Sequence, residues 1–107
     1  MEKTRVLFVC SGNIDRSPTA EGIFKTRPDL EVISAGTSWL ARRKVTGEMI
    51  EWADKIFVME KQHAEYIESI DPKARAKIVV LNIPDIYHRN DPELRKLLLE
   101  RVTPHLQ

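Results

Sequence analysis

The sequence predicts an α/β fold in which a four-stranded parallel sheet carries helices on both faces. Four short apolar runs, rich in β-branched residues, are each followed by a segment whose apolar residues recur at helical spacing. These runs do not alternate between apolar and polar residues, which is typical of strands that are buried on both faces. Right-handed crossovers restrict the arrangement of such strands, and we expect the order 2-1-3-4.

The expected strands cover residues 6–10, 31–35, 55–59 and 77–81. After the first of them, Ala20, Ile23 and Phe24 lie on one face of a helix. A second helical stripe covers residues 45–53, and residues 61–69 form a weaker helix candidate. Each of the four strands is thus followed by a helix or a helix candidate.

The last expected helix begins at Pro92, a residue favoured in the first helical turn, and Asp91 is placed to cap it.

The strand order also predicts where a ligand binds. A switch point lies between the first and third strands, and open α/β sheets bind ligands there, outside the carboxyl ends of the strands. The end of the first strand, at Cys10, is therefore the expected site.

Composition limits the class of protein. The 107 residues fit one domain, spanning 1–107. Lys plus Arg number 17 and Asp plus Glu 16, so no net field attracts nucleic acid or an anionic membrane. The single Cys excludes an intrachain disulfide and a Cys-rich zinc site. The three histidines, His63, His88 and His105, show no ligand spacing and are expected in solvent. No apolar stretch nears the ~20 residues of a membrane helix. We expect a cytoplasmic protein with no cofactor or metal, and no nucleic-acid or membrane partner.

Chemistry is expected in the loop after the first strand. Cys10 ends that strand, and Arg16 stands six residues later, where the first helix begins. Backbone amides that wrap inward at a helix start form a nest for an anion, and the planar Arg16 side chain can hold two phosphoryl oxygens. Such positive surroundings favour a cysteine thiolate, the nucleophile of phosphoryl transfer through phosphocysteine. The residues expected to bind phosphate are Ser11, Gly12, Asn13, Ile14, Asp15 and Arg16.

A buried structural cysteine is the alternative interpretation of Cys10. Free Cys is among the most buried residue types, and a bare C-x5-R pattern occurs often by chance. The strand end before Cys10, Gly12 after it and the helix start at Arg16 together favour the catalytic interpretation.

Four blocks of the chain resemble the low-molecular-weight protein tyrosine phosphatases. The stretch V-L-F-V-C-S-G-N-I-D-R-S-P-T-A-E, from Val6 to Glu21, resembles the family's V-L-F-V-C-x-G-N-x-C-R-S-P-x-A-E. Residues 34–37 match its S-A-G-T, residues 53–60 resemble its D-x-I-x-x-M-D strand, and residues 83–87 resemble its D-P-Y loop. The blocks follow the family's order.

The resemblance implies roles for the loop residues. Cys10 would be the nucleophile and Arg16 the phosphate clamp. Ser17 would donate a hydrogen bond to the thiolate and ease its departure from phosphocysteine. Asn13, bonded to Ser34, would hold the loop in its strained shape.

The resemblance also implies that Asp85 is the general acid, which protonates the leaving phenol and then activates water. Asp85 leaves the fourth strand at the ligand end of the sheet, whereas Asp91 fits a helix cap. Ile86 stands where the family has Pro. Tyr87 and Trp39 are candidate aromatic walls for a phenyl ring, with ordinary packing as the alternative for both.

We therefore expect a metal-independent cysteine phosphatase that hydrolyses aryl phosphate monoesters, with protein phosphotyrosine as the best match, through a phosphocysteine intermediate. Its partner would be a phosphorylated protein or a small aryl phosphate, and inorganic phosphate would be its product. The family's second loop Cys is Asp15 here, which puts a carboxylate near the anion site. A catalytically weak phosphate- or phosphoprotein-binding module on the same fold is the alternative.

Overall fold

The computed structural model describes residues 2–106 and is built around a four-stranded parallel sheet. The strand order is β2-β1-β3-β4, which confirms the predicted order. The strands are β1 (Thr4–Cys10), β2 (Leu30–Gly36), β3 (Lys55–Val58) and β4 (Ile78–Val80). Strand β1 lies between β2 and β3, and the two cores of the molecule bury its apolar residues on both faces of the sheet.

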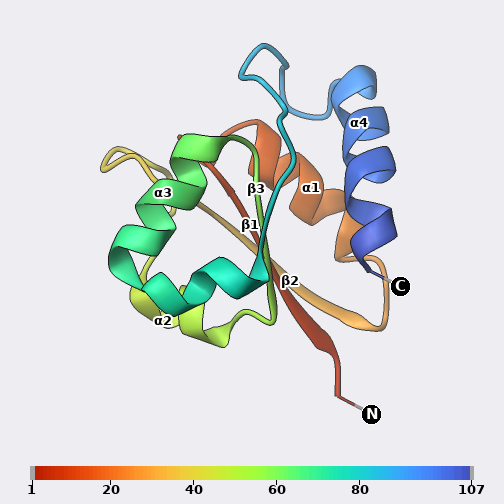
Figure 1. Cartoon of the computed structure of the whole chain (residues 1–107). Coiled ribbons are helices and arrows are strands. Elements are labelled where there is room, and N and C mark those ends of the chain that lie inside the picture. The colour runs from red at the N-terminus through yellow and green to blue at the C-terminus, as the bar shows by residue number, and fades with distance from the viewer. Residues whose placement is uncertain (1, 107) are drawn as a thin grey trace.

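Helices cover both faces of the sheet, as predicted (Figure 1). Helices α1 (Arg16–Phe24) and α4 (Pro92–Val102) pack on one face, and α2 (Gly47–Trp52) and α3 (Lys61–Ile70) pack on the other. Two short 3-10 segments, Pro72–Lys77 and Thr103–His105, complete the elements.

The two cores follow from the alternation of side chains along β1. Val6 and Phe8 point to the face that α1 and α4 cover, and Leu7 and Val9 point to the opposite face. Phe8 stacks between two aromatic rings, with centroid distances of 5.6 Å to Phe24 and 5.4 Å to Phe57. Because stacked rings bury large apolar areas, Phe8 anchors α1 to the sheet.

The predicted cap of the last helix is confirmed. The Asp91 side chain accepts a hydrogen bond of 2.8 Å from the Glu93 amide, and Pro92 occupies the first turn. Strands β3 and β4 end before the expected residues Met59 and Leu81. Both residues still donate backbone hydrogen bonds to the neighbouring strand and then lead away from the sheet.

The sheet gathers three chain segments at one edge. Because the strands are parallel, the residues that follow β1, β3 and β4 all emerge at their carboxyl ends. Within residues 2–106, no helix combines the length and the apolar character that crossing a membrane requires.

Candidate active site

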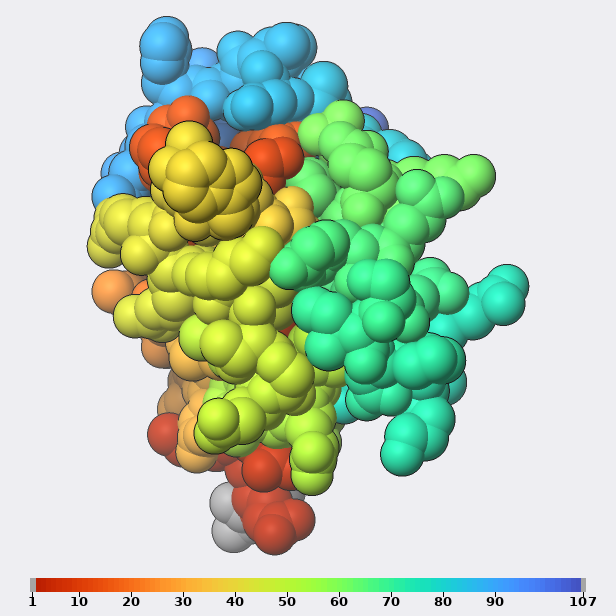
Figure 2. Space-filling model, turned by 90° about the vertical axis from the view of Figure 1, so that its left-hand side faces the viewer, coloured from red at the N-terminus to blue at the C-terminus, as the bar shows by residue number. Residues whose placement is uncertain are grey.

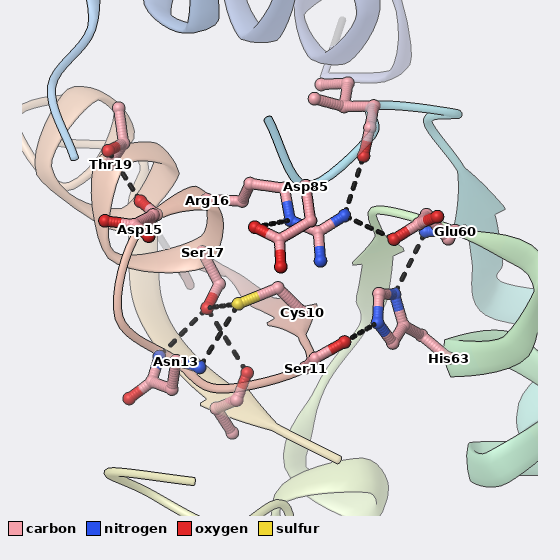
Figure 3. Close-up of polar contacts among 12 residues, drawn as sticks. Cys10, Ser11, Asn13, Asp15, Arg16, Ser17, Thr19, Glu60, His63 and Asp85 are labelled. Carbon is pink, nitrogen blue, oxygen red and sulfur yellow. Dashed lines mark hydrogen bonds and ion pairs between the residues drawn. The ribbon is translucent and has the colours of Figure 1, made fainter. Parts of the chain in front are cut away.

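The loop between β1 and α1 surrounds the sulfur of Cys10. Its Sγ lies 2.9 Å from Ser17 Oγ and accepts a hydrogen bond of 3.3 Å from the Asn13 amide (Figure 3). Cys10 is 3% exposed and borders a cavity of about 90 Å³. The residues lining this cavity are Cys10, Gly12, Ile14, Asp15, Arg16 and Asp85. The structure therefore brings the predicted nucleophile, clamp and acid to one small site.

Asn13 stabilises the loop through its backbone conformation and its side-chain hydrogen bonds. Its backbone adopts φ = 53°, in the left-handed region that Asn tolerates better than most residues. Its side-chain amide donates hydrogen bonds of 2.9 Å to both Ser17 and Ser34. Ser34 in turn donates a bond of 2.5 Å to the carboxylate of Glu21. The implied Asn13–Ser34 contact is thus present, and it extends to α1.

The end of β2 lies directly against the loop at Gly36. A Cβ atom at this position would collide with the carbonyl oxygen of Ser11 and the amide of Asn13. The next segment then follows the loop, because the Ser38 and Arg42 amides donate hydrogen bonds of 3.0 Å to the carbonyls of Ser11 and Gly12. Glycine is needed here for close approach of two backbones.

Arg16 is 2% exposed and is fixed through one of its terminal nitrogens. Nη1 donates to a Glu60 carboxylate oxygen at 2.6 Å and to the Ile83 carbonyl at 2.7 Å. These two bonds use both hydrogens of Nη1 and leave the Nε–Nη2 edge of the guanidinium for another ligand. The hydrogen bond from Arg16 also lowers the pKa of the Glu60 carboxyl, so Glu60 is ionised at neutral pH.

The Asp85 carboxylate lies beside the Nε–Nη2 edge of the Arg16 guanidinium. Its Oδ1 lies 3.8 Å from Arg16 Nε, and its side chain is 65% exposed (Figure 3). Asp91 instead caps α4. Of the two carboxylates considered from the sequence, Asp85 is the one that lines the cavity of Cys10.

The candidate aromatic walls lie outside the lining of this cavity. Trp39 is 83% exposed in the 37–46 segment, and Tyr87 is half-buried against the core beneath α1 and α4. Figure 2 shows the 37–46 segment (yellow) beside the loop after β1 (orange-red), below the segment before α4 (blue). The proposed role of both aromatic residues as walls for a phenyl ring stays a prediction.

Sequence reasoning missed two residues of the site, Glu60 and His63. The expectation that His63 lies in solvent is wrong, because its side chain is 0% exposed. Its Nδ1 accepts a hydrogen bond of 3.0 Å from the Glu60 amide, and its Nε2 lies 2.9 Å from Ser11 Oγ. Burial, with repulsion from Arg16, lowers the pKa of His63 to about 4. A usable signal was present, because Glu60 follows an apolar strand and His63 occupies the capping-box position three residues later.

Comparison with known proteins gives consistent results for sequence and structure. A family model described as low molecular weight phosphotyrosine protein phosphatase matches residues 5–52. A low molecular weight protein-tyrosine-phosphatase, Ptp of Acinetobacter johnsonii, is 31% identical over 120 residues, covering 84% of each chain.

Solved structures resemble the fold over nearly its whole length. The tyrosine phosphatase Wzb from Escherichia coli K30, in complex with phosphate, superposes with a TM-score of 0.80 and 26% identity, covering 96% of each chain. The YwlE arginine phosphatase from Geobacillus stearothermophilus gives a TM-score of 0.72 and 27% identity, covering 97% of this chain and 93% of the other.

Proposed function

Because this chain belongs to the low-molecular-weight protein-tyrosine-phosphatase family, we propose that it hydrolyses aryl phosphate monoesters through a phosphocysteine intermediate. Phosphotyrosine in proteins is the proposed substrate. One observation carries the proposal: Cys10, Arg16 and Asp85 border a single cavity, in which Asp85 Oδ1 lies 3.8 Å from Arg16 Nε.

The first step transfers the phosphoryl group to sulfur. The Nε–Nη2 edge of Arg16 and the loop amides hold the phosphoryl oxygens, and the Cys10 thiolate attacks phosphorus. As the S–P bond forms, the bond between phosphorus and the aryl oxygen breaks. Protonated Asp85 gives its proton to that oxygen, so the alcohol leaves neutral.

The second step returns the enzyme to its starting state. Asp85, now a carboxylate, takes a proton from water while the water oxygen attacks phosphorus. The S–P bond breaks, and inorganic phosphate and the Cys10 thiolate are released. The hydroxyl of Ser17, 2.9 Å from Sγ, is positioned to donate a hydrogen bond to the departing thiolate.

An aryl group suits the surroundings of the cavity. Ile14 lines the cavity and is exposed, so it offers apolar surface to a ring. Trp39 adds exposed aromatic surface on the neighbouring segment. A phosphoarginine substrate would instead place a charged guanidinium group against the apolar Ile14 side chain.

A phosphate-binding module without turnover is the second candidate function. Asp15 favours it, because this carboxylate belongs to the cavity lining and would repel a bound dianion. Under this alternative the protein would bind phosphate but would not release a phenol from its ester.

The test is hydrolysis of p-nitrophenyl phosphate by the wild-type protein and by Cys10→Ser, in the presence of a chelator. We expect turnover by the wild type and none by the variant, with the same thermal unfolding for both. Equal rates for the two proteins would end the proposal. Phosphotyrosine and phosphoarginine peptides, tested side by side, then decide the substrate, and we expect the tyrosine ester to be preferred.

A further inference from the structure

His63 joins two parts of the phosphate site that come from distant parts of the chain. On one side it meets Ser11, the residue after the nucleophile, at 2.9 Å. On the other side, its Nδ1 accepts a hydrogen bond from the backbone amide of Glu60. The carboxylate of Glu60 in turn accepts a 2.6 Å hydrogen bond from Arg16 Nη1. Figure 3 shows the imidazole between Ser11 and Glu60. One ring therefore contacts both the phosphate loop and the support of the arginine.

The hydrogen bonds determine the tautomer of His63. A backbone N–H can only donate, so Nδ1, which receives the Glu60 amide, carries no proton. The hydrogen of the neutral ring is then on Nε2 and is donated to Ser11 Oγ. The His63 ring is wholly buried, although Ser11 and Glu60 are only partly buried, so the loss of either bond leaves a buried ring nitrogen without its partner.

We propose that His63 is a positioning residue of the phosphate site, which acts by fixing the loop through Ser11 and the Arg16 support through the backbone of Glu60. This inference rests on the proposed function only in taking the cavity of Cys10 as the place where phosphate binds. The Nε–Nη2 edge of Arg16 and the loop amides must point at the same anion. Because His63 links Ser11 in the loop to Glu60, which holds Arg16, it keeps these donors in the geometry that binds the anion.

The ring must stay neutral to make both contacts. A protonated ring would carry a hydrogen on each nitrogen, so Nδ1 would no longer accept from the Glu60 amide. The charged groups around the ring come from three elements: Arg16 at the start of α1, Glu60 before α3 and Asp85 before α4. Burial opposes protonation most strongly and the positive charge of Arg16 adds to it, whereas the two carboxylates favour protonation.

Three substitutions distinguish the contact of His63 with Ser11 from its contact with the Glu60 amide. Ser11→Ala and His63→Asn both remove the bond to the loop, and the Asn oxygen can still accept the Glu60 amide near the place of Nδ1. His63→Gln places an amide nitrogen near the position of Nε2 and can restore the donation to Ser11. The exposed His105 provides the matched control, His105→Asn.

The measurement is the dissociation constant of inorganic phosphate by calorimetry, together with kcat and KM for p-nitrophenyl phosphate. We expect Ser11→Ala and His63→Asn each to weaken phosphate binding about threefold to tenfold, the usual effect of one lost hydrogen bond. The double variant should be no weaker than either single variant, because both remove the same bond. His63→Gln should recover most of the affinity, and His105→Asn should match the wild type.

Two results would overturn the proposal: phosphate affinities of Ser11→Ala and His63→Asn equal to that of the wild type, or losses that simply add in the double variant. If His63→Asn does not fold, Ser11→Ala and His63→Gln still give the answer. Phosphate binding also separates this inference from the proposed function. A wild type that binds phosphate without turnover contradicts the phosphatase alone, and unchanged binding in the variants contradicts the role of His63 alone.

Discussion

The side-chain amide of Asn13 donates a 2.9 Å hydrogen bond to the hydroxyl of Ser34, which joins the phosphate loop to β2. The same amide also donates to Ser17, which contacts the Cys10 sulfur. The position of the sulfur is thus connected through side chains to the central sheet. The conformation of Asn13, with φ = 53°, depends on these contacts.

Replacing Asn13 with Ala should disturb both stability and activity. The substitution removes two buried hydrogen bonds and leaves a left-handed backbone without the residue that favours it. We expect a loss of about 2–3 kcal/mol in unfolding free energy, measured in urea, and a fall in kcat/KM of roughly 10- to 100-fold. Asn82 has a similar φ of 56° and serves as the control. Asn82→Ala should cost about 1 kcal/mol and leave kcat/KM unchanged; an equal loss of activity would assign the effect to backbone strain.

Gly36→Ala should damage the site through a steric collision. The new methyl group would meet the backbone of Ser11 and Asn13, neither of which can move without displacing the phosphate loop. We expect destabilisation of about 1–3 kcal/mol and a large loss of phosphate affinity. Gly22→Ala is the matched control, because the space around Gly22 is open and Ala is favoured inside a helix by about 1 kcal/mol. Thermal unfolding and phosphate titration of both variants provide the measurement, and normal phosphate binding by Gly36→Ala would contradict the assigned packing.

The general acid can be identified with two isosteric substitutions. Asp85→Asn removes the proton donor above Arg16 and should lower kcat for p-nitrophenyl phosphate by about 10²- to 10⁴-fold, with little change in stability. Asp91→Asn retains a good helix cap and should leave both quantities near those of the wild type. Steady-state kinetics decide between them, and the opposite pattern would transfer the acid role to Asp91.

Stability should depend on pH through His63. Its pKa is about 4 in the folded protein and 6.5 in the unfolded chain. Below pH 6.5 the unfolded state therefore takes up a proton that the folded state does not, so stability decreases as pH falls toward 4. The expected loss between pH 7 and pH 5 is about 2 kcal/mol. The low pKa of Glu60 also reduces stability in acid, but only below its unfolded value near pH 4.5.

Urea unfolding at pH 7, 6 and 5 measures this dependence. His63→Asn should remove most of the slope in this range, whereas His105→Asn should retain it. A wild-type slope that persists in His63→Asn would show that another group titrates.

The loop between β1 and α1 could be predicted because its parts are close in sequence. A strand that ends at Cys10 and a helix that begins at Arg16 leave five residues between them, and so short a connection restricts where the backbone amides can point. Asp91 was equally predictable, because a cap and the helix it starts are adjacent residues. The strand order followed from the alternation of strands and helices.

Residues that support the site from a distance could not be assigned in this way. Ser11 and His63 are separated by 52 residues, and Arg16 and Glu60 by 44. Their contacts depend on the register of β1 with β3, in which Val9 pairs with Val58 and the two strand ends emerge together. The capping-box position places His63 at the start of α3, but the contact of its ring with Ser11 depends on how distant segments pack.

The strands, the helices and the loop from Cys10 to Arg16 follow from local backbone preferences and apolar periodicity, so the amino-acid sequence was enough to predict them. The carboxylates that reach Arg16 and the burial of His63 depend instead on how separate elements pack, because that packing sets the distances between them. Side chains from after β3 and β4 meet the loop after β1 because parallel strands release them at one edge of the sheet.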